Sequence, residues 1–193
     1  AHPVPNTANR DGARRLLEAA RAADSDTLAV VAVTGGGSAL LAAPAEGVPL
    51  ADLRELTDAL VRSGAPIDRI NAVRKHVSAV KGGRLARELA PATTVGVVFS
   101  DVTSDDPSVV ASGPLSPDPT SYDDALTVLS AYGVDAPGSV TGHLQRGAAG
   151  EVGETPGPDD SAFDEVSVHI LADNATAIAA AREVCAAAGF EPG

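Results

Sequence analysis

Three short apolar runs stand out in a chain that is otherwise patterned for helices. They are Leu28 to Val33, Thr94 to Phe99 and Val166 to Ala172, and β-branched residues are frequent in each of them. Runs of this length that stay apolar without alternation are typical of strands covered on both faces, as in a parallel sheet. The pattern therefore predicts three buried strands.

Segments with apolar residues three and four positions apart lie before, between and after these runs, and this spacing predicts helices. They cover residues 11–23, 50–62, 66–80, 84–89, 122–132, 138–147 and 174–188. Helices between strands imply parallel strands with helices on the faces of the sheet, which is an α/β architecture. The stretch 150–161 is polar, and we expect it to form a loop without core residues.

Charge and composition exclude several functional classes. The 193 residues carry a net charge of −12 and only two lysines, so no nucleic-acid partner is expected. No apolar run approaches the ~18 residues of a membrane span, so we expect a cytoplasmic protein with no membrane partner. The single cysteine, Cys185, cannot form an internal disulfide and is predicted to be a packed thiol. The chain has no methionine and begins Ala-His-Pro, which we interpret as a segment of a longer protein.

A triglycine turn follows the first predicted strand. Gly35, Gly36 and Gly37 stand between Thr34 and Ser38, after which apolar residues resume. Glycines let backbone N–H groups approach an anion closely, and the start of a helix adds partial positive charge. The spacing matches neither the dinucleotide fingerprint nor the phosphate loop that ends in lysine. The turn is therefore either an anion site or a tight packing turn between a strand and a helix.

A cationic stretch in the predicted helix 66–80 is the second candidate. Arg74, Ser78 and Lys81 are spaced at i, i+4 and i+7, so one helix face would carry all three. Such a face would bind a carboxylate or a phosphoryl group in transfer, or else pair with the acids of the protein itself. The adjoining faces would carry Asn71, Lys75 and His76, and a histidine in this setting is more often structural than catalytic.

Carboxylates gather where the second predicted strand ends. Asp101, Asp105 and Asp106 follow that strand closely. Ligands collect at the carboxyl ends of parallel strands, and Mg²⁺ prefers one or two carboxylates together with waters and phosphates. Asp101 and Asp105 are therefore candidate metal ligands, although aspartates in such a stretch also serve as caps and turn formers.

Four segments of the chain resemble the signature blocks of one family, the class II, MOFRL-associated glycerate 2-kinases. They are TGGGSALLAAPAEGVPL (34–50), INAVRKHVSAVKGGRLA (70–86), SDVTSDDPSVVASGPLSPDPTSYDDA (100–125) and GETPGPDD (153–160), in the order and spacing of the family. The start HPVPN (2–6) is similar to the family element HPVPD. The departures are mild: Thr34 stands for Ser, Ser104 for Gly and Leu115 for Thr.

The resemblance implies a Rossmann-like α/β/α sandwich, in which a parallel sheet has helices on both faces. It implies transfer of the γ-phosphoryl group of ATP to a hydroxyl of glycerate, with Mg²⁺, to give 2-phosphoglycerate. Residues 1–193 would be the central part of the N-terminal kinase domain, because the chain lacks the N-terminal segment of the family, with its lysine, and its C-terminal domain. We therefore expect negligible activity from the isolated chain. The sequence is compatible with assembly into a homo-oligomer.

The resemblance also implies roles for particular residues. Arg74, Lys75 and Lys81 would neutralise charge, and Asp101 would either hold Mg²⁺ or orient the attacking hydroxyl as a base. The residues implied to be catalytic are Asp101, Lys81 and Arg74. Those implied to bind substrate or phosphate are Gly35, Gly36, Gly37, Ser38, Asn71, Lys75, Ser78 and Ser112, and those implied to bind metal are Asp101 and Asp105.

Two other functional classes are compatible with parts of the pattern. A non-catalytic module that binds an anion or a sugar phosphate would also use a parallel sheet and a triglycine turn. A dinucleotide-dependent dehydrogenase is disfavoured, because the glycine spacing is wrong and the acidic residue that binds the ribose has no counterpart at a strand end. Calorimetry separates these classes, because a module should bind a phosphorylated sugar without consuming ATP, whereas a kinase fragment should bind glycerate or nucleotide weakly.

Overall fold

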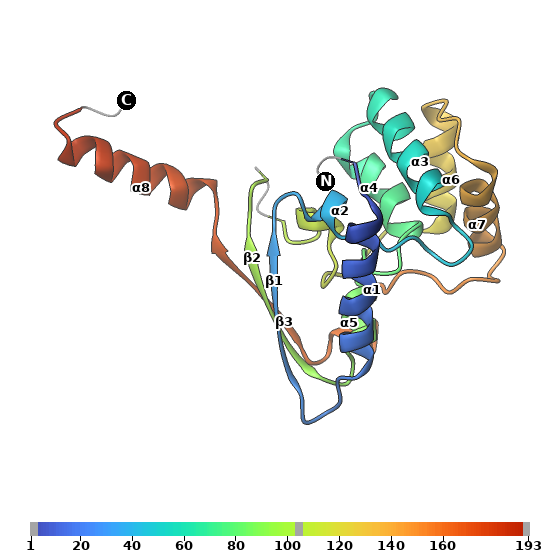
Figure 1. The fold of residues 1–193 in the computed structure, drawn as a ribbon, viewed down its shortest axis with the longest axis horizontal. Helices are drawn as coiled ribbons and strands as arrows, with labels where there is room; N and C mark the ends of the chain where they lie inside the picture. Colours follow the sequence, from blue (N-terminus) through green and yellow to red (C-terminus); the bar gives the residue numbers. More distant parts are fainter. Residues whose placement is uncertain (1–3, 103–105, 191–193) are drawn as a thin grey trace.

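A computed structural model describes residues 4–102 and 106–190 of the protein (Figure 1). Its framework is a parallel sheet of three strands, β1 (Leu28–Thr34), β2 (Thr93–Phe99) and β3 (Val166–Ala172), in the order β1-β2-β3. β1 pairs with β2 in register along its whole length, and Thr34 faces Phe99 at the end. The carboxyl ends of these two strands therefore meet at one edge of the sheet, and the predicted α/β class is confirmed.

Helices lie around this sheet, and α3, α5, α6, α7 and α8 are confirmed to within one residue at either end. The helices are α1 (Thr7–Arg21), α2 (Gly37–Leu40), α3 (Leu50–Arg62), α4 (Ile67–His76), α5 (Arg84–Leu89), α6 (Tyr122–Ala131), α7 (Gly138–Ala148) and α8 (Asn174–Ala187), with short 3₁₀ turns η1 (Val110–Ser112) and η2 (Ser161–Phe163).

Two helices differ from the prediction by more than one residue, and side-chain hydrogen bonds explain the start of α1 and the end of α4. α1 begins before residue 11 because Asn6 and Asn9 form a reciprocal capping box. α4 ends at His76 instead of residue 80, because the Ser78 hydroxyl accepts hydrogen bonds from the backbone N–H groups of Val80 and Lys81. Serine side chains compete with helical hydrogen bonds in this way. The sequence pattern contained both signals, but periodicity alone did not detect them.

The helices form two groups with separate cores. α1 and α5 pack on one face of the sheet, where Leu85, Leu89 and Ala20 contact the strands. α3, α4, α6 and α7 form a bundle beside the sheet (Figure 1) around Leu56, Leu60 and other buried apolar residues. The cationic residues of α4 are thus carried by the bundle, while the triglycine turn and Asp101 are carried by the sheet.

Two glycines of α7, Gly142 and Gly147, should have opposite effects on stability when each is replaced by alanine. A Cβ atom added to Gly147 would lie 2.3 Å from the buried ring of Tyr122, whereas one added to Gly142 meets nothing within 4 Å. Gly147→Ala is therefore expected to lower the free energy of unfolding by about 1–3 kcal/mol through overpacking. Gly142→Ala should raise it by up to about 1 kcal/mol, because alanine favours the helix. Denaturation in urea measures both, and equal effects would contradict this packing.

The loop 150–161 is not free of core residues, so that prediction is wrong. Thr155 is only 3% exposed, and Val152 packs against the bundle core. The loop is held down by polar contacts with α4 and α6, and a pattern of apolar residues cannot reveal such contacts.

The opposite face of the sheet and α8 are exposed. Val30 is 67% exposed on that face of β1, so the prediction that this strand is buried on both faces is wrong for this structure. α8 extends away from the remainder of the protein (Figure 1), and Cys185 on it is exposed, so the prediction of a packed thiol is wrong for this structure. In the described part of the chain, no helix has the length and apolar character to cross a membrane.

Candidate functional site

A cavity of about 310 Å³ lies where β1 and β2 end, between the sheet and the bundle. Its wall is formed by the triglycine turn, by α4 and the turn that follows it, and by Asp101, which lies two residues beyond the end of β2. The predicted site residues that line it are Gly35, Gly36, Ser38, Asn71, Arg74, Ser78, Lys81 and Asp101. The buried hydroxyl of Ser112 contacts two of these residues, Ser38 and Asn71. Most of the predicted set is therefore brought together from distant parts of the sequence.

The glycines of the turn have different local roles. Gly36 has a φ of 77°, a conformation that favours glycine, and it lets the chain leave β1 and start α2. A Cβ atom on Gly35 would lie 1.9 Å from Oδ2 of Asp101, so only glycine lets this carboxylate lie against the turn. Gly37 packs against Ala111 instead and does not line the cavity. The turn is therefore both a packing turn and part of the cavity wall.

The cations of the site lie on two different structural elements. Arg74 belongs to α4, but Ser78 and Lys81 follow the end of that helix, so the prediction of one continuous helical face is wrong. All three residues nevertheless line the cavity, because the Ser78 turn folds the chain back. Nζ of Lys81 donates a 2.8 Å hydrogen bond to the carbonyl oxygen of Leu41. Residue types alone could not predict that the carbonyl oxygen of Leu41 accepts from Lys81.

The electrostatics of this pair favour a bound anion. Burial and, secondarily, the charge of Arg74 lower the pKa of Lys81 from 10.5 to about 7. Burial also lowers the pKa of Arg74. Within the described residues neither side chain forms an ion pair with a carboxylate. Two cations enclosed side by side disfavour each other's charge, and an anion bound between them would stabilise both.

Lys75 lies elsewhere, although it is next to Arg74 in the sequence. Its Nζ is 3.3 Å from Oδ1 of Asp118, and both side chains are buried. Lys75 is absent from the cavity wall, so the structure does not bring it to the site as predicted. The alternative for the basic stretch, pairing with the protein's own acids, is correct for this residue.

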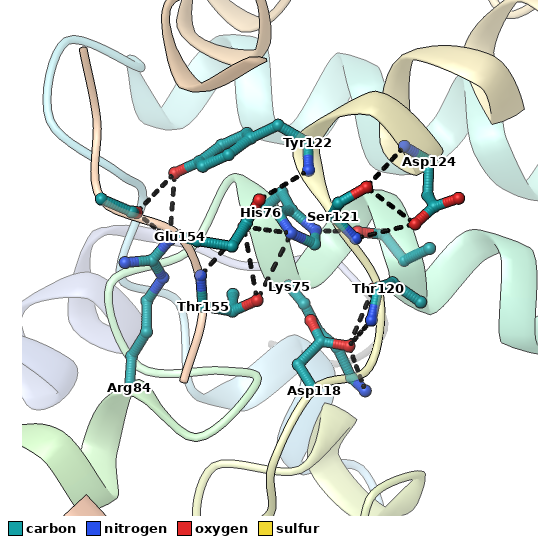
Figure 2. A network of polar contacts seen from close by, with 12 residues as sticks. Lys75, His76, Arg84, Asp118, Thr120, Ser121, Tyr122, Asp124, Glu154 and Thr155 are labelled. Carbon is teal, nitrogen blue, oxygen red and sulfur yellow. Dashed lines mark hydrogen bonds and ion pairs between the residues drawn. The ribbon is translucent and has the colours of Figure 1, made fainter. Parts of the chain in front are cut away.

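His76 has a structural role in the polar network of Figure 2. Its Nδ1 donates a 2.7 Å hydrogen bond to the carbonyl oxygen of Ala72, and its Nε2 lies 2.8 Å from Oε1 of Glu154. Glu154 also accepts from the backbone N–H groups of Tyr122 and Thr155. This network attaches the 150–161 loop to α4 and α6, so it holds the bundle together behind the cationic residues.

A third part of the wall is a segment that contains the predicted residue Ser112 and has a strained backbone that the sequence did not indicate. Ala111 has a φ of 53° and Ser112 a φ of 62°, which are rare values for residues with side chains. The Ser112 hydroxyl lies 2.9 Å from the Ser38 hydroxyl and 3.1 Å from Oδ1 of Asn71. Strained backbone persists only where the surroundings hold it, and it concentrates at functional sites. Neither alanine nor serine is a residue type that indicates a left-handed backbone conformation at these positions.

Asp101 is the carboxylate of the cavity wall that could bind Mg²⁺. The described residues contain no group of three or more His, Cys, Asp or Glu side chains placed to hold a metal ion. Asp101 is an exposed carboxylate on the cavity wall, and it forms no ion pair with the described residues. Asp106 accepts from the backbone N–H of Ser108 and acts as a turn former. Asp105 lies outside the described residues. One free carboxylate fits a Mg²⁺ ion that arrives with phosphates and keeps its waters.

Comparisons with known proteins place these features in a family. The sequence pattern of the family DUF4147, described as a domain of unknown function, matches residues 1–145. A protein of Agrobacterium vitis provisionally named a hydroxypyruvate reductase is 39% identical over 192 residues, which are 100% of this chain and 42% of that protein. The glycerate 2-kinase of Pyrococcus horikoshii is 42% identical over 156 residues, 80% of this chain and 35% of that enzyme.

A solved structure shares the fold. The crystal structure of glycerate kinase from Thermotoga maritima matches with a TM-score of 0.83 and 37% identity, over 98% of this chain and 43% of that one. The chain thus spans less than half the length of these relatives.

Proposed function

Because the chain belongs to the DUF4147 family, we propose that it is the anion-binding part of a glycerate 2-kinase, which transfers the γ-phosphoryl group of ATP to glycerate. The product would be 2-phosphoglycerate. The observation that carries the proposal is the pair Arg74 and Lys81, which lines the same cavity as Asp101 and has no carboxylate partner among the described residues. The printed names of two relatives agree with it.

The residues of the cavity would divide the work of phosphoryl transfer. This reaction needs positioning and neutralisation of spreading charge more than covalent chemistry. Arg74 and Lys81 would bind the carboxylate of glycerate or the phosphoryl group, and Gly35 and Gly36 would let that group approach the backbone. Asp101 would orient the attacking hydroxyl or hold Mg²⁺.

Two cofactors belong to this proposal. ATP would supply the phosphoryl group, and Mg²⁺ would neutralise phosphate charge when bound, with Asp101 as its ligand from the described residues. Both would act in a cleft that a second domain, of the MOFRL type, closes over the cavity. The protein would work in the cytoplasm, where ATP is available, and assembly into a homo-oligomer is compatible with this role.

The name of the Agrobacterium relative implies a different reaction, reduction of hydroxypyruvate. A reductase would use a dinucleotide, but the triglycine turn lacks the spacing of the dinucleotide fingerprint. The wall carries enclosed cations instead, which suit a phosphoryl group or a carboxylate. A non-catalytic module would also bind an anion here, but it would have no use for the free carboxylate of Asp101.

The proposal is tested with the complete polypeptide that the gene encodes. With glycerate, ATP and Mg²⁺, ³¹P NMR should show 2-phosphoglycerate and ADP forming in equal amounts. Residues 1–193 alone should form neither at a measurable rate, because a cleft needs its second wall. Oxidation of NADH with hydroxypyruvate and no ADP formation would instead support a reductase. Binding of phosphorylated sugars without turnover of ATP would support the module.

A further inference from the structure

A buried relay of three side chains connects three parts of the cavity wall. Ser38 comes from α2, Ser112 from the end of η1 and Asn71 from α4. Ser112 is 0% exposed, and its hydroxyl oxygen lies within hydrogen-bond distance of both other side chains. The 3.0 Å hydrogen bond from the Gly82 N–H to the Ser112 carbonyl also fixes this residue. The relay is thus held from several sides.

The hydrogen bonds of the relay have a defined direction. Ser112 has a single hydroxyl hydrogen, and Oδ1 of Asn71, 3.1 Å away, can only accept. Ser112 therefore donates to Asn71. In the second contact, at 2.9 Å, Ser112 has no hydrogen left to give, so Ser38 is the donor. The hydroxyl hydrogen of Ser38 is thus used inside the protein and is not available to a ligand.

The same direction leaves one donor facing the cavity. Oδ1 of Asn71 is occupied by Ser112, so the amide nitrogen Nδ2 points the other way with two N–H groups. Asn71 is only 5% exposed, lines the cavity, and its Nδ2 donates to none of the described residues. This nitrogen is not fully enclosed by protein, so a ligand oxygen in the cavity can accept its hydrogen bonds.

The position of Asn71 on α4 indicates which ligand oxygen it meets. Asn71 and Arg74 are three residues apart on one helix, so they share a face, and both line the cavity. A guanidinium and an amide on one face present N–H donors to a carboxylate, which has two acceptor oxygens.

We propose that Asn71 is a specificity-determining residue whose Nδ2 donates to a carboxylate oxygen of the substrate beside Arg74, with Ser112 as the positioning residue that orients the amide. This inference rests on the proposed kinase function. It assigns the cavity to a small hydroxycarboxylate and not to an uncharged polyol, because the hydroxyl groups of a polyol could accept from both side chains but would carry no negative charge to pair with Arg74.

The test compares variants of the complete polypeptide in the glycerate kinase assay. Asn71→Ala should raise KM for glycerate about tenfold and leave kcat and the KM for ATP within about twofold, as expected for a ground-state contact. Asn71→Asp should raise KM at least about a hundredfold, because an acceptor with negative charge replaces the donor. Ser112→Ala should raise KM severalfold, and by more than Ser38→Ala does, because the Ser38 hydroxyl acts on Asn71 only through Ser112.

Controls and outcomes separate the two levels of the proposal. Asn174→Asp adds the same charge at an exposed position of α8 and should leave KM unchanged. Unchanged KM values for Asn71→Ala and Asn71→Asp in an active enzyme overturn the inference alone. A large effect of Ser38→Ala with none of Asn71→Ala overturns it too, because the relay then runs in the opposite direction. A wild-type protein that does not phosphorylate glycerate overturns the proposed function instead.

Discussion

Replacing Asp101 by asparagine is expected to lower kcat for glycerate phosphorylation by about a thousandfold, in the range typical of a lost general base. The carboxylate lies against Gly35 on the cavity wall, so it faces the space where a substrate would bind. Asparagine keeps the size of the side chain and removes only its charge. Release of ADP by the complete polypeptide measures the loss, and an unchanged melting temperature shows that the fold is retained.

A matched control is Asp123→Asn, an exposed carboxylate in the first turn of α6 away from the cavity wall. Its kcat should stay within about twofold of wild type. The two roles of Asp101 give different signatures in the asparagine variant. A lost metal ligand raises the Mg²⁺ concentration needed for half-maximal rate, whereas a lost base flattens the acidic limb of the pH profile. A kcat within a few-fold of wild type would contradict both roles.

The position of Asp101 shows what a sequence pattern can predict. Strands are marked by their apolar runs, and parallel strands align their carboxyl ends, so residues just after β1 and β2 had to be neighbours. This reasoning brought Gly35 and Asp101 together across more than sixty positions of sequence. It required no knowledge of side-chain packing.

Features that depend on single hydrogen bonds could not be predicted in this way. The helix ends early because one hydroxyl, that of Ser78, satisfies two backbone N–H groups. Lys75 turns away because Asp118, far along the chain, offers a buried partner. Helical periodicity does not distinguish the two adjacent cations Arg74 and Lys75. In the structure, Lys75 is buried against Asp118, whereas Arg74 lines the cavity.

The backbone conformation of Ala111 and Ser112 could not be predicted from the sequence either. Ala111 and Ser112 adopt left-handed angles that sequence rules reserve mainly for glycine and asparagine. These angles bring the Ser112 hydroxyl to Ser38 and Asn71, and they create the relay. The resemblance to a family implied a role for Ser112, but only the geometry shows which side chains its hydroxyl contacts.

The second large effect concerns Lys81, and it should depend on pH. Burial and the neighbouring Arg74 lower its pKa to about 7, so the free protein carries a charged Lys81 below pH 7 and a neutral one above it. An anionic substrate is bound by the charged form. We therefore expect kcat/KM for glycerate to fall as pH rises through about 7, by about tenfold per pH unit beyond it.

Lys81→Met tests this assignment, because methionine has a similar length and no charge. At pH 6 the variant should lose about 10²–10³-fold in kcat/KM, as expected when a charge-stabilising donor is removed. At pH 9 the loss should be much smaller, since the wild-type lysine is then neutral as well. Arg15→Met, an exposed cation on α1, is the control and should follow the wild type at both pH values. A wild-type profile that is flat between pH 6 and 9 would show that Lys81 does not bind the anion through its charge.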